Sequence, residues 1–299
     1  MSVLGALFEG AGGTATVALR ALVFAATIIA AGTVVFRLVL ARTHEDRGSA
    51  TPMGLAAAMA LVLAAAPRLW LQARGFVDVG DPVTPMMVNV LQTGWGRGWL
   101  LQLGGAALAA VGFVLVRRAM RSGELMSVLG VSALCLAPAL MGHAAAAPSV
   151  RWLAIGADAV HVAAAASWTG TLALLAWRAP GLLRSSEGGA RLAEWIERFH
   201  RVALGSAALL LATGAAGVWL RVQRLGTLLH SGYGLLLFAK LTAVGVVVAL
   251  GAWHARRAPA AARQQANTLA QSLQLELFFA LVTIIATAVL VGTSPEPNA

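Results

Sequence analysis

The sequence predicts an all-α integral membrane protein, a bundle of about eight transmembrane helices with both termini on the outer, periplasmic side. Three observations lead to this fold class. The chain is 59% hydrophobic and only 11% charged, whereas soluble domains carry about 25% charged residues. Its apolar residues gather into long runs. Arginines collect in alternate connections between those runs, as expected of a chain that crosses a membrane repeatedly.

Each apolar run approaches or exceeds the roughly 20 residues that a helix needs to cross a bilayer. The predicted spans are 16–40, 53–73, 98–116, 124–143, 151–177, 200–220, 233–254 and 271–293. The second contains Pro67, which a membrane helix tolerates where neighbours satisfy the freed carbonyl group. Abundant small residues permit close helix packing without identifying an interface. No connection is long enough for a soluble domain, so residues 1–299 are predicted to form one membrane domain.

The arginine distribution predicts the orientation. Of the 22 basic residues 21 are Arg, and Lys240 is the only Lys. The connections after the first, third, fifth and seventh spans hold twelve arginines, and the remaining segments hold five if Arg151, at the start of the fifth span, is counted. Because basic residues favour the cytoplasmic side, both termini are expected to face out. The net charge of +10 therefore needs no nucleic-acid partner, and membrane lipid is the expected surrounding.

Other features limit the class of function. The N-terminal segment contains Glu9 and no basic residue before Arg20, unlike a cleaved signal peptide. The single cysteine, Cys135, excludes an internal disulfide. The sequence has no phosphate-binding glycine loop, catalytic Ser/His/Asp order or zinc-protease motif, so no enzymatic activity is expected. The segment "GWGRGW" (94–99) is predicted to be a turn with interfacial tryptophans.

The fifth span carries the polar residues that most need an explanation. Asp158 and His161 are three residues apart and share one helical face, which continues to Trp168. His161 is ten residues into the span, or about 15 Å along the helix. A charged group at that depth is costly against lipid. Both side chains are therefore expected to face the bundle interior, either as a metal or proton site or as a polar clamp between helices.

Soft donors on the same side of the membrane favour a metal, specifically copper as Cu(I). His143 ends the fourth span, Met141 lies beside it, and Met86 and Met87 lie in the outer connection before the third span. Imidazole with thioether sulfur suits copper, and Asp158 would be a ligand or would orient an imidazole. Cys135, two helical turns below His143, offers sulfur deeper in the bundle. The methionines could equally be core residues.

Two further ionisable residues lie inside spans. Lys240 is in the outer part of the seventh span, and Glu276 is near the inner end of the eighth. Together with Asp158 and His161 they outline what we call the polar line through the bundle. Such a line is expected of a transport or proton path. Separate contacts that lock helices together would produce the same pattern.

The motifs resemble those of the copper resistance protein D (CopD) family. "GHAA" (142–145) followed by "DAVHVAAAASWTG" (158–170) is similar to its GHAA…DxxHxxxxxxWxG signature. The segments "RFHRVALGSAALLLATG", "GYGLLLFAKLTAVGVVVALGAWHARR" and "ELFFALVTIIATAVLVGTSPEP" continue the resemblance, as does "LQTGWGRGWLLQ". It is strongest over 91–297 and weak before that. His254 stands where the family usually has Asn.

The resemblance implies copper uptake across the bacterial inner membrane toward the cytoplasm, with a separate periplasmic CopC-like protein as partner. It also implies that the family's marked positions are here His143, Asp158, His161, Trp168, Lys240 and Glu276. Two alternatives stay open. A buried His could ligate haem in a membrane redox protein, or the protein could be a copper sensor or assembly factor that moves no metal. The oligomeric state does not follow from the sequence.

Overall fold

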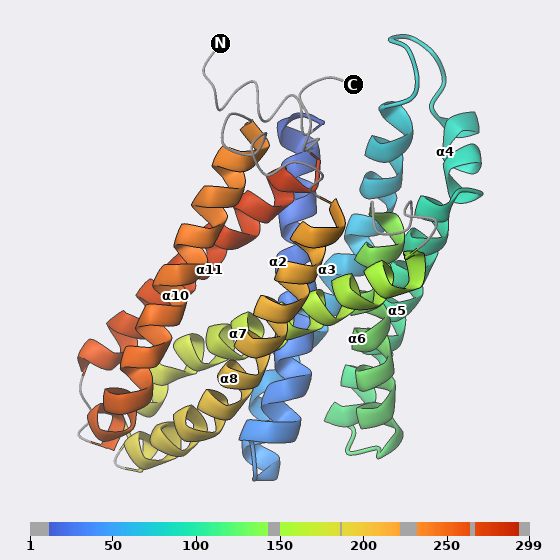
Figure 1. Cartoon of the computed structure of the whole chain (residues 1–299). Coiled ribbons are helices and arrows are strands. Elements are labelled where there is room, and N and C mark those ends of the chain that lie inside the picture. Colours follow the sequence, from blue (N-terminus) through green and yellow to red (C-terminus); the bar gives the residue numbers. More distant parts are fainter. Residues whose placement is uncertain (1–11, 143–149, 186, 222–231, 264–266, 293–299) are drawn as a thin grey trace.

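The computed structural model describes residues 12–142, 150–185, 187–221, 232–263 and 267–292, and every regular element in those ranges is a helix (Figure 1). The first half of the chain contains α2 (Gly13–Val35), a π-helical turn (Phe36–Leu40), α3 (His44–Arg74), α4 (Thr84–Leu91), α5 (Gly94–Arg117) and α6 (Ser122–Met141). The second half contains α7 (Arg151–Leu182), α8 (Gly188–Arg221), α10 (Gly232–Arg263) and α11 (Asn267–Leu290). Apart from α4, each helix contains a segment long and apolar enough to cross a membrane, which confirms the eight predicted spans.

The first and last helices place the chain ends together. α2 begins and α11 ends at the same end of the bundle, where α4 also lies (Figure 1). This is the arrangement that an even number of spans requires. Following the arginine distribution we call this the outer end and the opposite one the inner end. The side of the membrane that each end occupies stays a prediction.

Several helices extend beyond their predicted spans. α3 begins at His44, nine residues before the predicted start at residue 53. The Thr43 side chain caps it by accepting a hydrogen bond from the backbone N–H of Asp46 at 3.1 Å, and Glu45 and Asp46 place acidic groups in the first turn. Both features stabilise a helix N-terminus. Hydropathy detects the apolar part of a helix alone, so polar turns of this kind escape it.

The outer connection before the third span differs from the prediction. It contains the short helix α4, and residues 94–99, predicted to be a turn, are the start of α5. Thr93 caps α5 through its hydroxyl, which accepts a hydrogen bond from the N–H of Gly96 at 3.2 Å. A Cβ on Gly96 would lie 2.4 Å from the Leu91 carbonyl oxygen. Gly96 therefore serves close packing against α4 and not a turn conformation.

We call helices α2–α6 the N-terminal bundle, and glycines bring its helices together. α5 and α6 pack along a row of small residues. A Cβ on Gly112 would lie 2.4 Å from the Ser127 backbone nitrogen, and one on Gly130 would lie 2.5 Å from the Ala109 nitrogen. Both distances are far below van der Waals contact. The backbones can approach this closely only because these positions carry no side chain.

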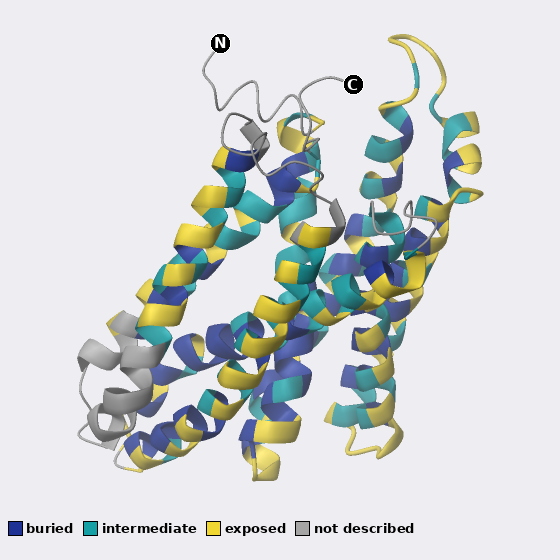
Figure 2. Cartoon of the chain, viewed as in Figure 1, coloured by how far each residue is buried: buried dark blue, intermediate teal, exposed yellow. Residues whose placement is uncertain are grey.

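Helices α7, α8, α10 and α11 form what we call the C-terminal bundle. α7 packs on α8 and α11, and α10 packs on α8 and α11. The C-terminal bundle meets the N-terminal bundle where α7 crosses α2: a Cβ on Gly32 would lie 2.2 Å from the Gly170 carbonyl carbon. Exposed residues follow α8 and α10 along the parts of these helices whose burial is described (Figure 2). Most of these positions are apolar, as expected of helices that face lipid.

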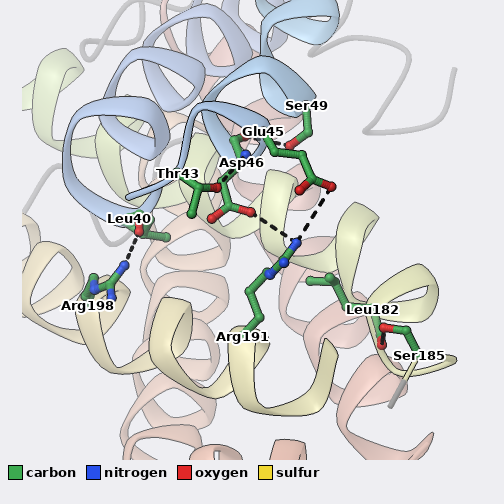
Figure 3. A network of polar contacts seen from close by, with 9 residues as sticks. All are labelled: Leu40, Thr43, Glu45, Asp46, Ser49, Leu182, Ser185, Arg191 and Arg198. Carbon is green, nitrogen blue, oxygen red and sulfur yellow. Dashed lines mark hydrogen bonds and ion pairs between the residues drawn. The ribbon is translucent and has the colours of Figure 1, made fainter. Parts of the chain in front are cut away.

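Polar contacts at the inner end join α8 to the connection between α2 and α3 (Figure 3). Arg198 donates a hydrogen bond to the carbonyl of Leu40, the last residue of the π-helical turn. Arg191 lies 3.5 Å from the Asp46 carboxylate and 4.0 Å from that of Glu45. Within the N-terminal bundle, the buried Arg37 pairs with Glu124 at 2.6 Å.

Candidate functional site

His161 packs against α8. Its Nδ1 lies 2.9 Å from the hydroxyl oxygen of Thr213, and its Cε1 would lie 3.8 Å from a Cβ built on Gly214. The ring is half-buried. α8 therefore offers the imidazole a hydrogen-bonding hydroxyl and, one residue later, a position without a side chain. The contact places His161 inside the C-terminal bundle, about 15 Å from the start of α7 at 1.5 Å per residue.

The hydrogen bonds of Thr213 favour one tautomer of His161. The single hydroxyl proton of Thr213 goes to the Leu209 carbonyl, which lies 2.6 Å away. Toward His161 the hydroxyl oxygen can then only accept, so the Nδ1 nitrogen carries the hydrogen and donates it. In that neutral tautomer the ring lone pair is on Nε2. This is the form in which histidine binds metals, with the second ring nitrogen held by a hydrogen bond.

The structure says less about Asp158 and His143 than about His161. Asp158 lies half-buried one helical turn toward the outer end from His161. His143 and the outer connection up to residue 149 lie outside the described residues. The roles of both residues in binding copper stay predictions.

The three predicted methionine donors come together. Met86 and Met87 of α4 and Met141 of α6 all pack against one apolar cluster that includes Leu69 and Trp99. We call these three residues the methionine cluster. Met141 lies over Gly98, where a Cβ would meet its Cγ at 2.6 Å. The sequence placed these residues on the same side of the membrane, and the unpredicted helix α4 is what brings them into contact with one core.

The methionine cluster and His161 lie on different elements. The methionines belong to the N-terminal bundle and the imidazole faces α8 in the C-terminal bundle. Among the described residues, no three His, Cys, Asp or Glu side chains gather in a way that could hold a metal ion. The described residues thus provide two separate positions for metal donors. The thioether groups are in the N-terminal bundle and the imidazole is in the C-terminal bundle.

A half-buried cation borders the methionine cluster, and it is not among the residues predicted from the sequence. Arg68 of α3 donates a hydrogen bond to Gln102 of α5 and its guanidinium lies 5.6 Å from the ring centroid of Trp95. Gln102 is buried. An arginine inside a predicted span was the available signal, because such residues are rare and functional by default.

Trp168 and Glu276, two of the polar residues in the inner half, meet over Gly251. A Cβ built on Gly251 would lie 3.6 Å from Oε1 of Glu276 and 3.9 Å from Cζ2 of Trp168. Glu276 is 1% exposed. Lys240 is eleven residues before Gly251 on α10, which is about 16 Å of helix. The polar line therefore has an outer part with His161 and an inner part with Glu276.

Cys135 lies elsewhere. It is buried in an apolar cluster of the N-terminal bundle, with Leu134, Phe113 and Val131 among its members. These neighbours offer no second donor of the kind that binds copper.

Two family models match the chain. The model described as "Copper resistance protein D-like, N-terminal domain" matches residues 11–152, and the model described as "Copper resistance protein D" matches residues 193–290. Together they cover 240 of the 299 residues. The first match includes residues 11–90, where the resemblance of motifs is weak. No curated protein and no solved structure matches.

The two matches follow the two bundles. The first ends at the start of α7 and the second begins early in α8. Residues 153–192, with Asp158, His161 and Trp168, lie between them. His143 falls in the first match, and Lys240 and Glu276 fall in the second.

Proposed function

Because the chain belongs to the copper resistance protein D family and is a multi-pass protein of the inner membrane, we propose that it carries copper across that membrane toward the cytoplasm. Copper, as Cu(I), is the cargo. Thioether and imidazole are its donors in the outer half of the membrane. No chemical conversion is part of the proposal.

The observation that carries the proposal is the state of His161. A half-buried imidazole inside the bundle has its Nδ1 held by Thr213, whose own proton goes to Leu209. That leaves the metal-binding lone pair on Nε2.

The route that we propose begins at the methionine cluster and continues at His161. Met86, Met87 and Met141 lie at the outer end of the N-terminal bundle, where α4 packs on α3 and α5. Thioethers bind Cu(I) without a charge, so each position can hold the ion and release it again. Asp158 and His143 would complete the coordination at His161, and a separate periplasmic CopC-like protein would deliver the ion.

The test is uptake of Cu(I) into proteoliposomes that contain a trapped copper indicator. We expect uptake by the wild type and its loss in His161→Ala, with unchanged membrane insertion and melting temperature. The matched control is His200→Ala, because His200 lies near the inner end of α8 and is also half-buried. Uptake at the wild-type rate in His161→Ala would overturn the assignment of the site.

The same experiment separates the alternatives. A wild-type protein that binds Cu(I) tightly but shows no uptake would be a sensor or an assembly factor. A wild-type protein that shows neither binding nor uptake, but purifies with the absorption band of haem, would be a redox protein.

A further inference from the structure

Two polar atoms in the inner half of α7 are buried without a hydrogen-bond partner in the described part of the chain. They are Nε1 of Trp168 and the hydroxyl oxygen of Thr171. Trp168 is 7% exposed and Thr171 is 0% exposed. Buried donors of this kind are nearly always satisfied in folded proteins, and an unfilled partner position is often occupied by water.

Thr171 differs from the threonines whose hydroxyls bond within their own helix. In a helix the hydroxyl of Thr commonly bonds to the carbonyl four residues earlier. Six threonines do so here: Thr33, Thr51, Thr213, Thr242, Thr283 and Thr287. Thr171 has no such bond. Its hydroxyl is therefore available to a group that does not belong to its own helix.

The surroundings of Trp168 contain a matching acceptor. A Cβ on Gly251 would lie within 4 Å of two atoms, Oε1 of Glu276 and Cζ2 of Trp168. Cζ2 is on the edge of the indole ring that also carries Nε1. Thr171 is one helical turn from Trp168 on a neighbouring part of the same face. Trp168 of α7 and Glu276 of α11 thus border one region, where Gly251 of α10 carries no side chain, and Thr171 follows one turn farther along α7.

The donors and the acceptor select the ligand. An indole N–H can only donate, so it cannot coordinate a bare cation, and a carboxylate repels an anion. Water accepts from the indole N–H and the hydroxyl and donates to the carboxylate. We propose that the inner half of the C-terminal bundle contains an internal water site bounded by Trp168, Thr171 and Glu276. The site hydrates a carboxylate that is enclosed by helices, and it does not depend on copper movement.

The first experiment is hydroxyl-radical labelling by X-ray radiolysis of the full-length protein in nanodiscs, read by mass spectrometry. Radicals form from bound water, so buried residues beside water are oxidised promptly. We expect rapid oxidation of Trp168 and none at Trp195, which is 1% exposed and packs edge-on against Phe36. Equal rates for the two tryptophans would overturn the proposal, and this comparison needs no variant.

The second experiment uses Thr171→Val, which keeps the side-chain shape and removes the hydroxyl. If water occupies the site, the variant loses a hydrogen bond, so the melting temperature and Trp168 labelling should both fall. If the site is dry, the variant removes an unpartnered buried hydroxyl and the melting temperature should rise. A rise would overturn the proposal. Thr242→Val is the control, because Thr242 is exposed and bonds to its own helix.

Gly251→Ala tests the space itself. The added methyl group would lie at ordinary contact distances from Glu276 and Trp168, so it fills the region without a clash. We expect Trp168 labelling to fall several-fold in this variant. Labelling at the wild-type rate would contradict the placement of the water.

Discussion

The N-terminal and C-terminal bundles are both built from long apolar helices but are packed differently. In the N-terminal bundle, glycines bring α5 and α6 into backbone contact. In the C-terminal bundle, the apolar segments of α8 and α10 are mostly exposed or half-buried, although α7 is buried to the same extent as α2. The C-terminal bundle nevertheless contains His161, Lys240 and Glu276.

The difference shows where a polar path can be accommodated. Helices in backbone contact leave no room for a side chain between them, whereas helices held apart by side chains can enclose imidazole, carboxylate and water. The N-terminal bundle is thus suited to be a scaffold that presents the methionine cluster at its outer end. The C-terminal bundle is suited to hold the polar line.

The largest effect is expected where the two bundles cross. In Gly32→Val the added Cβ would lie 2.2 Å from the backbone of Gly170, so α2 and α7 must separate. We expect a loss of about 3 kcal/mol of stability, the upper range for overpacking, seen as loss of monodisperse protein in size-exclusion chromatography. Gly104→Ala is the control, because nothing lies near a Cβ there. If Gly32→Val remained monodisperse, the close contact between α2 and α7 would not be needed to hold the two bundles together.

The next effect tests the N-terminal bundle as a scaffold. Glu124→Gln leaves the buried Arg37, 3% exposed, without its carboxylate. Breaking a fully buried pair costs about 3–5 kcal/mol, and since Glu124 is 35% exposed we expect about 2 kcal/mol. Thermal unfolding in detergent measures it. Glu194→Gln, at a pair on α8 whose carboxylate is 62% exposed, should change little, and equal effects of the two substitutions would contradict the prediction.

A third prediction concerns the C-terminal bundle as the metal position. Thr213→Val removes the acceptor of the His161 Nδ1–H group, so the ring loses its fixed orientation. We expect Cu(I) affinity, measured by competition with a chromophoric chelator, to fall about tenfold, the lower range for residues that orient a ligand. The melting temperature should change little. Unaltered affinity would mean that His161 does not bind copper through Nε2.

The methionine cluster tests whether the N-terminal bundle contributes donors. The triple substitution Met86→Leu, Met87→Leu and Met141→Leu keeps volume, and such exchanges cost less than about 1.5 kcal/mol each. We expect Cu(I) uptake to fall several-fold at low copper concentration, with normal insertion. Met59→Leu is the control, since Met59 is 45% exposed on α3. Uptake equal to that of the control would show that the three methionines only pack the apolar core and do not bind copper.

The smallest effect is expected at the inner contact between the bundles. Arg191→Ala removes the pairs with Asp46 and Glu45. Arg191 is 35% exposed and Asp46 is 6% exposed, but the 3.5 Å between them is longer than the 2.6 Å of the Arg37–Glu124 pair. We therefore expect about 1 kcal/mol, the upper range for exposed pairs. The melting temperature should therefore fall slightly, and less at high salt. A large loss of stability would show that α8 is fixed to the N-terminal bundle mainly through this contact.

The polar residues show the limit of prediction from the sequence. Periodicity placed Asp158, His161 and Trp168 on one face of one helix, and the cost of burying them in lipid pointed that face inward. It did not show that Thr213 of α8 fixes the imidazole, or that Glu276 of α11 meets Trp168 over Gly251. Those contacts depend on the rotation and crossing of helices that are distant in the chain.

The sequence by itself determined the eight spans and their alternation. In lipid each helix must satisfy its own backbone hydrogen bonds, so hydropathy along the chain is enough to find it. It could not determine that α4 forms, that Gly94–Trp99 is helical, or that the N-terminal bundle is glycine-packed. Only the tertiary structure decided these, because a glycine in a turn and a glycine in a close crossing look alike until the second helix is in place.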